Sequence, residues 1–180
     1  MAADYLVSSL QPLSLDGPPP YTAEQFLGLC RSQLSAKDAE AVASVMADAP
    51  SAHPLAAIWR DLDAQLRNAI AAERARLRGQ DAARWRRSVD GCSLFWANRA
   101  AGAFQEKDTA RRERLLDQVR WDAAAELVPP AAPLSTAAVF AYAIRLSIVL
   151  RRAARDVAAG NDVFNRLTAA SKIEFKESHT

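Results

Sequence analysis

The chain has 180 residues, half of them hydrophobic, and alanine supplies 39 of these, which leaves 51 larger apolar side chains to build a core. That number suits one compact domain, and the excess of alanine over Val, Ile, Gly and Pro predicts an all-α, mainly helical fold and excludes collagen-like, disulfide-rich and wholly disordered chains. The 23 basic and 21 acidic residues give a net charge of +2, which is too small to require nucleic acid or an acidic membrane as a partner.

Residues 1–21 are predicted to be an extended N-terminal segment that packs on the helical body. Apolar residues alternate loosely over 5–15 and Pro12 interrupts them, which favours an extended segment or a short edge strand over a helix. A turn at Asp16-Gly17 and three consecutive prolines follow. No basic residue precedes the first apolar residues, so we expect no signal peptide and a cytoplasmic protein.

Capping signals predict the first helices of the body. Thr22 and Gln25 have the spacing of a capping box, and Ser35 is the expected cap of a second helix, so the two helices make a short hairpin. Apolar residues at three- and four-residue spacing then predict one helix of about 24 residues. It begins at Pro54, which suits a first helical turn, and ends before Gly79, which suits the C′ position.

The middle of the chain predicts shorter helices. A basic one is expected around residues 84–87, between Gly79 and Gly91. The next is expected to present an apolar face made of Leu94, Phe95, Trp96, Ala100 and Phe104. The isolated glycines Gly28 and Gly102 lie inside predicted helices, where close helix packing would explain them.

The C-terminal third predicts two long helices and a short one. Asp108 or Thr109 is the expected cap of the first, which stops before Pro129. The second, expected from Ser135 to Gly160, holds the longest apolar run of the chain.

That run covers residues 134–150. It contains Arg145 and is shorter than the roughly 20 residues of a spanning helix, so we expect a buried helix of a soluble protein. A short helix over 162–171 would complete a single helical domain of residues 22–171, and residues 172–180 would be a polar tail.

Side chains that usually carry catalysis or metal binding are scarce. The two histidines, His53 and His179, are expected to be solvated surface residues. Cys30 and Cys92 have no metal-ligating spacing and are expected to be buried thiols in a reducing compartment. Because no phosphate-binding glycine loop and no HExxH motif occur either, we expect no enzymatic activity, no cofactor and no metal.

One basic cluster is a candidate interface. It comprises Arg74, Arg76, Arg78, Arg84, Arg86 and Arg87, with Trp85 among them. Arginine and tryptophan are enriched in protein interfaces, and Trp85 is the tryptophan expected outside the core. Acidic residues interleave with the run, which disfavours nucleic acid and leaves an acidic protein partner or plain solvent. The residues predicted for an interface are Arg84, Trp85, Arg86 and Arg87.

The two ends of the chain carry a further pattern. At the N-terminal end it comprises Tyr5-Leu-Val-Ser-Ser-Leu10, Leu13-Ser-Leu-Asp16, Pro20-Tyr21-Thr22, Phe26, Leu34-Ser35 and Asp38. At the C-terminal end it comprises Ala141-Tyr142-Ala143, Leu146, Ile148, Arg151, Gly160, Phe164 and Leu167. Together these residues resemble a bacterial family of uncharacterised proteins encoded alongside V/A-type ATPase subunits, which look like short relatives of the ATPase C subunit, called d in eukaryotes.

The resemblance implies a helical, non-catalytic subunit or accessory protein that links the central shaft and the membrane rotor ring of an ion-transporting ATPase. Its partners would be other subunits of that complex, and it would touch the inner membrane only indirectly, from the cytoplasmic side. It further implies that Tyr5, Leu6, Leu10 and Leu15 hold the N-terminal segment on the body, and that Tyr142, Leu146 and Phe164 pack the last helices. The chain would be one helical body where a full C subunit has three. The alternative function is a stand-alone helical module that binds nucleic acid or an acidic protein partner.

Overall fold

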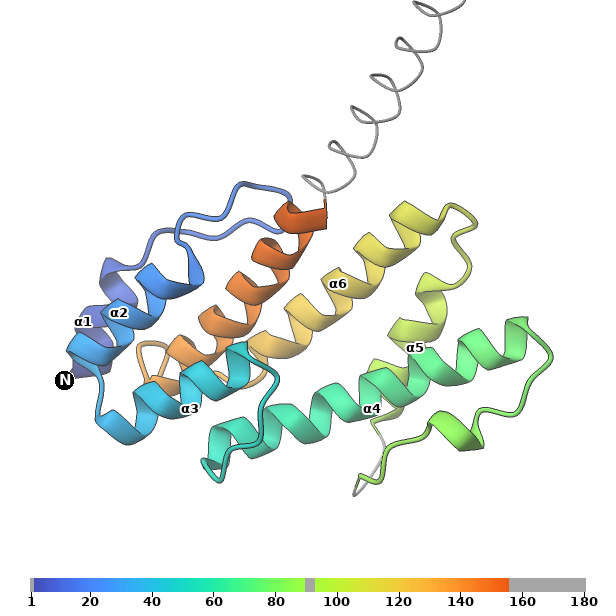
Figure 1. Ribbon diagram of the computed structural model, residues 1–180, viewed down its shortest axis with the longest axis horizontal. Coiled ribbons are helices and arrows are strands. Elements are labelled where there is room, and N and C mark those ends of the chain that lie inside the picture. The colour runs from blue at the N-terminus through green and yellow to red at the C-terminus, as the bar shows by residue number, and fades with distance from the viewer. Residues whose placement is uncertain (1, 90–92, 156–180) are drawn as a thin grey trace, which may run out of the picture.

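The computed structural model describes residues 2–89 and 93–155, and within them the chain is helical and contains no strand (Figure 1). The elements are α1 (Ala2–Ser9), α2 (Ala23–Gln33), α3 (Ala36–Met46), α4 (Pro54–Leu77), the 3-10 turn η1 (Ala83–Trp85), α5 (Leu94–Ala103) and α6 (Thr109–Ala125). Residues 136–155 are helical as well and are called the 136–155 segment below. The predicted all-α fold is confirmed. The expectations for Cys92, Gly160, Phe164, Leu167, the 162–171 helix, the polar tail and His179 lie outside the described residues.

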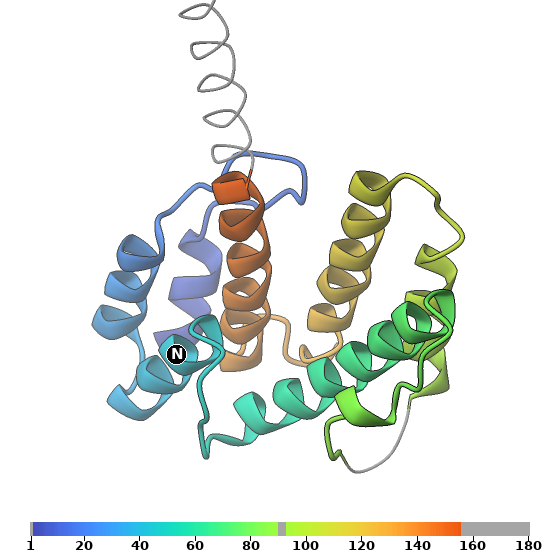
Figure 2. The ribbon, with the colours of Figure 1, turned by 45° about the vertical axis from the view of Figure 1, so that its right-hand side comes forward.

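The helices form two groups that meet along α6 and the 136–155 segment. In the first group, α1, α2 and α3 surround the 136–155 segment; in the second, α4, α5 and α6 pack on one another (Figure 2). The 136–155 segment and α6 lie side by side and run in opposite directions in both views. The long helix α4 belongs to the second group, and Ala56 near its start joins the core of the first.

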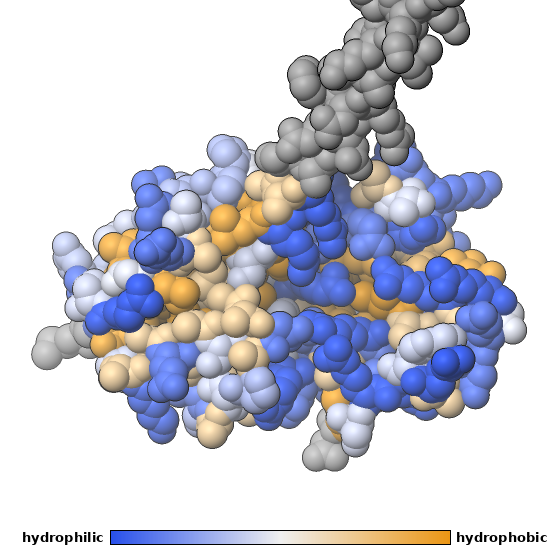
Figure 3. Space-filling model, viewed as in Figure 1, coloured by the Kyte–Doolittle hydropathy of each residue, from blue (hydrophilic) through white to orange (hydrophobic). Residues whose placement is uncertain are grey.

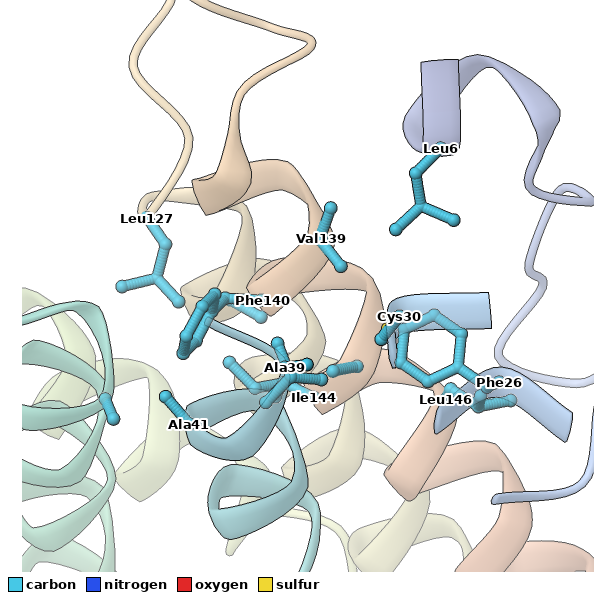
Figure 4. Packing of buried hydrophobic residues seen from close by; sticks show 14 of the residues in the cluster. Leu6, Phe26, Cys30, Ala39, Ala41, Leu127, Val139, Phe140, Ile144 and Leu146 are labelled. Atoms are coloured by element: carbon cyan, nitrogen blue, oxygen red, sulfur yellow. The ribbon is translucent and has the colours of Figure 1, made fainter. Parts of the chain in front are cut away.

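The main core lies in the first group of helices. Figure 4 shows Phe26 and Cys30 of α2 close to Leu146, and Phe140 of the 136–155 segment near Leu127, with Ala39 and Ile144 between the two groups. Phe26, Phe140 and Leu146 are among the largest fully buried side chains. The predicted burial of the apolar run is therefore confirmed, and no helix of the described chain is long and apolar enough to cross a bilayer.

The predicted helix boundaries are found where local chemistry fixes them. Thr22 and Gln25 form a complete capping box, and Ser35 and Asp108 accept the N–H groups of the residues three positions on. Pro54 is the first residue of α4. At the other end of α4, Gly79 has φ +63°, and the Gly79 and Gln80 N–H groups donate to two carbonyls of the last turn, as in a Schellman motif.

The N-terminal prediction is wrong for residues 2–9, which form α1 instead of an extended segment. Leu6 of this helix is 1% exposed in the core, and Leu10, which directly follows the helix, packs against the same core. The helix ends before Pro12, which disfavours helical geometry in the residue preceding it. Tyr5 points away and is 66% exposed, so it does not hold the segment on the body as the resemblance implied. Residues 10–21 are not helical, as expected.

His53 is not the solvated residue that the sequence predicts. It is the N-cap of α4, and its Nδ1 accepts the Leu55 N–H at 3.2 Å. Its Nε2 lies 3.0 Å from a carboxylate oxygen of Asp38, and its ring stacks on Phe140 with 4.9 Å between ring centroids. The side chain is therefore only 12% exposed. Because Pro54 starts the helix, the residue before it takes the capping position, which the sequence pattern alone did not reveal.

Three further expectations are corrected by the packing. Nothing lies within 4 Å of the position that a Cβ would take at Gly28 or Gly102, so close helix contact does not explain these glycines. In α5, Trp96 and Ala100 are buried, but Leu94 and Phe95 are exposed, because residues only one or two positions from Trp96 point to another side of the helix. The basic helix expected around 84–87 is reduced to η1, after which Arg86 is extended.

Candidate functional site

The predicted interface lies on the segment that joins α4 to α5. The segment turns at Gly79 and runs back beside α4, below it in Figure 1. Asp81 accepts the Ala83 N–H at 2.9 Å and so starts η1. The side-chain amide of Asn68 in α4 then holds the Arg87 backbone twice, because it accepts the Arg87 N–H at 2.7 Å and donates to the Arg87 carbonyl at 2.9 Å. These bonds present the side chains of Arg84 to Arg87 on the outside of α4.

All four predicted interface residues are exposed. Trp85, which the sequence placed outside the core, is 45% exposed. The guanidinium carbon of Arg84 lies 5.2 Å from the centroid of the Trp85 ring, within the range of a cation–π contact. Arg86 and Arg87 line a second depression on the other side, near Asn68.

A hollow of about 290 Å³ opens between Trp85, α4 and α6. Its apolar lining comes from Ile70, Ala71, Ala75 and Trp85. Its basic lining comes from Arg67, Arg74, Arg78 and Arg120. Of these arginines, Arg74 pairs with Glu113 of α6 at 3.0 Å. Residues that the sequence placed on separate helices therefore meet at one site, named the Trp85 hollow below.

A chain of ion pairs crosses the cleft between the two helix groups. Arg67 of α4 donates to Asp48 after α3 at 2.9 Å and also pairs with Asp63. Arg120 of α6 lies 3.7 Å from Asp63 and 3.6 Å from Asp117. The cleft beside these groups has a volume of about 360 Å³. Figure 3 shows that this face is hollowed at its centre, where hydrophilic residues border apolar ones.

The ion pairs continue into the 136–155 segment. Arg151 donates to Asp117 at 2.8 Å, and Arg152 lies 3.7 Å from the second carboxylate oxygen of Asp117, which accepts no hydrogen bond within the described residues. Arg152 also donates to Asp16 at 3.2 Å, and Asp16 pairs with Arg114 of α6. We call the whole set, from Asp48 to Asp16, the cleft network. It joins both helix groups through groups of opposite charge.

The pKa values of Arg120 and Arg67 in this network shift in opposite directions. Burial lowers the pKa of Arg120, because removing the guanidinium from water disfavours its charged form. Burial acts in the same way on Arg67, but the carboxylates of Asp63 and Asp48 outweigh it and raise its pKa. Both guanidiniums are charged at neutral pH, because arginine is not deprotonated in proteins. The network is therefore an electrostatic connection between the two helix groups.

Sequence reasoning missed the cleft network. Asp63 and Arg67 are four residues apart, and Asp117 and Arg120 are three apart, which is visible as helical pair spacing. Nothing in the sequence says that Asp63 also meets Arg120, or that Asp117 meets Arg151, because these contacts join different helices.

The expected buried thiol is confirmed for Cys30. Its side chain is fully buried, and burial raises its pKa to about 12, so it carries almost no reactive thiolate at neutral pH. Within residues 2–89 and 93–155, no group of three or more His, Cys, Asp or Glu side chains has an arrangement that could hold a metal ion.

Comparison with known proteins finds one similarity. Residues 93–174 match a family model described as a protein of unknown function (DUF2764). The match starts just before α5 and includes α6 and the 136–155 segment. The chain is thus similar to an uncharacterised family over these residues. No curated protein and no solved structure matches the chain.

Proposed function

We propose that this chain is a non-catalytic subunit or accessory protein of a bacterial V/A-type ATPase that links the central shaft to the membrane rotor ring. The observation that carries the proposal is the packing of the residues on which the resemblance to the ATPase-associated family rests. Although Phe26 and Tyr142 are far apart in the sequence, their rings stack with 5.3 Å between centroids. The Tyr142 hydroxyl donates to the Gln11 carbonyl at 2.8 Å, and Tyr21 lies against the same ring. The two ends of the pattern therefore form a single structural unit.

The helical structure suits the proposed role of a connecting subunit. A connecting subunit needs a stiff helical frame and polar surfaces for its neighbours. The cleft network ties the two helix groups together, and the exposed Arg84, Trp85, Arg86 and Arg87 offer a surface for an acidic neighbour. The protein would then be cytoplasmic, and it would be peripheral to the inner membrane through the complex.

Co-purification tests the proposal. The tagged full-length chain, expressed in its own bacterium, should recover shaft and rotor-ring subunits of the ATPase. Replacing Arg84, Arg86 and Arg87 together by glutamate should lower that recovery at least about tenfold, because each exposed guanidinium would become a repelling carboxylate at the interface.

The matched control variant carries three arginine-to-glutamate substitutions elsewhere on the surface. Arg31, Arg111 and Arg155 are exposed, and their side chains contact no carboxylate among the described residues, so their replacement by glutamate should leave recovery unchanged. Failure of the unaltered chain to recover any ATPase subunit would contradict the proposed function. Equal recovery by both triple variants would contradict only the interface.

The unpaired arginines beside an exposed tryptophan favour one alternative, a stand-alone module that binds nucleic acid. Such binding should weaken steeply with salt, because neutralised phosphates release counterions. The measurement is binding of the purified chain to generic DNA or RNA at 50 and 200 mM salt. Binding that falls steeply between these concentrations would favour the nucleic-acid module over the ATPase subunit.

A further inference from the structure

Nine of the eighteen arginines within residues 2–89 and 93–155 are paired with carboxylates of the same chain. The paired ones are Arg60, Arg67, Arg74, Arg76, Arg99, Arg114, Arg120, Arg151 and Arg152. In contrast, Arg78, Arg84, Arg86 and Arg87 contact no carboxylate within residues 2–89 and 93–155. The nearby Asp81 is engaged with the Ala83 N–H. Four of the nine described arginines without a carboxylate partner therefore lie within residues 78–87, next to Trp85.

The Trp85 hollow combines apolar surface with two of these unpaired arginines, because Arg78 lines it and Arg84 lies over the ring of Trp85. Ile70 and Ala75 are buried at its floor, and Ala71 and Trp85 line it as well. Its volume of about 290 Å³ is at the lower end of the roughly 300–1,000 Å³ of small-molecule pockets. The hollow is thus suited to apolar side chains that project from a larger partner.

The combination of an apolar hollow and unpaired arginines favours one class of anionic partner over another. A nucleic-acid backbone would satisfy the arginines but has no aliphatic group for Ile70, Ala71 and Ala75, and Arg84 already lies over the Trp85 ring. An acidic amphipathic helix supplies both kinds of group at once, because leucine-type anchors every three or four residues can enter the hollow while flanking carboxylates meet the rim.

We propose that the Trp85 hollow is the docking site for an acidic amphipathic helix of a partner protein, with apolar anchors in the hollow and carboxylates on Arg78 and Arg84. The inference rests on the proposed function in one respect, since it names the class of partner for the same face. It requires no particular ATPase subunit.

The test uses the purified full-length chain and a fluorescein-labelled synthetic helix of about 20 residues. Leucine occupies one face of this peptide and glutamate the rest. Fluorescence anisotropy should give saturable binding. A peptide with glutamine in place of glutamate, and a shuffled peptide in which leucines share no face, should each bind at least about tenfold more weakly.

Two variants locate the site. Arg78→Glu reverses a rim charge beyond the end of α4, and Ala71→Glu places a carboxylate inside the hollow one turn from Arg67 and Arg74, where a helix accepts glutamate well. Each should weaken peptide binding at least about tenfold. Arg31→Glu, on the exposed surface of α2, is the matched control and should change binding less than about twofold.

Several outcomes would overturn the inference. The first is that the glutamine or shuffled peptide binds as tightly as the glutamate peptide. The second is that Arg78→Glu and Ala71→Glu leave peptide binding unchanged. The third is that a 20-nucleotide single strand binds more tightly than the glutamate peptide and that Arg78→Glu abolishes this binding. Self-association of the chain that Ala71→Glu abolishes would assign the hollow to a second copy. Peptide binding without recovery of ATPase subunits would contradict the proposed function alone, whereas recovery of the subunits without peptide binding would contradict this inference alone.

Discussion

At the residue scale, His53 connects three parts of the molecule that are separated in the sequence. It caps α4 through Leu55, bonds to Asp38 of α3 and stacks on Phe140 of the 136–155 segment. With Nδ1 accepting the Leu55 N–H, Nε2 carries the hydrogen that is donated to Asp38. The sequence predicts a solvent-exposed histidine next to a proline, because none of these three partners can be identified before the chain is folded.

We predict that His53→Ala lowers the free energy of unfolding by about 1–2 kcal/mol, because the first turn of α4 loses its cap and Asp38 loses a donor. His53→Asn should lose less, since asparagine is among the best N-cap residues. Urea unfolding followed by far-UV circular dichroism measures both. Equal stability of His53→Ala and the unaltered chain would show that the cap contributes nothing.

At the element scale, the residues next to a helix end determine where the helix begins or stops, whereas they do not determine which face of the helix is buried. Thr22, Ser35 and Asp108 cap their helices because a side-chain oxygen three residues upstream satisfies a free N–H group, whatever the rest of the fold does. The face of α5 that is buried depends on which helices surround it, so the exposure of Leu94 and Phe95 could not be derived from their apolar character.

Alanine substitutions at Gly79 and Gly28 should have opposite effects on stability. Gly79→Ala should cost about 1–2 kcal/mol, because φ of +63° is strained for a residue with a Cβ, and Gly79→Asn should cost less. Gly28→Ala in α2 should instead stabilise the fold by about 0.5–1 kcal/mol, since alanine is the better helix former and the added Cβ meets no atom within 4 Å. Thermal and urea unfolding measure the three variants side by side. A destabilised Gly28→Ala would mean that this glycine is needed for another reason.

At the scale of the whole molecule, the cleft network determines how the two helix groups are joined. Asp117 of α6 is 2% exposed and faces Arg151, Arg152 and Arg120, so it connects α6 to the 136–155 segment across the cleft. A buried carboxylate among arginines contributes through its partners. Removing its charge leaves Arg151 without a carboxylate partner, whereas Arg120 keeps Asp63 and Arg152 keeps Asp16.

Asp117→Asn should therefore lower the free energy of unfolding by about 1–3 kcal/mol. Asp61→Asn is the matched control: Asp61 is exposed, lies 4.0 Å from Arg60, and should change stability by no more than about 0.5 kcal/mol. Equilibrium urea unfolding of the full chain measures both. Similar values for the two variants would mean that the cleft network contributes no more than an ordinary surface ion pair.

The all-α class, most helix boundaries, the burial of the apolar run and the exposure of Trp85 could be predicted from the sequence, because propensity, capping and apolar spacing act within a few residues of one another. Four features could not: the helix over residues 2–9, the partly buried cap His53, the ion pairs by which Asp117 and Asp63 join different helices, and the hollow that Ile70, Ala71 and Trp85 line among arginines. These features depend on contacts between residues far apart in the chain, and such contacts exist only once the helices have packed.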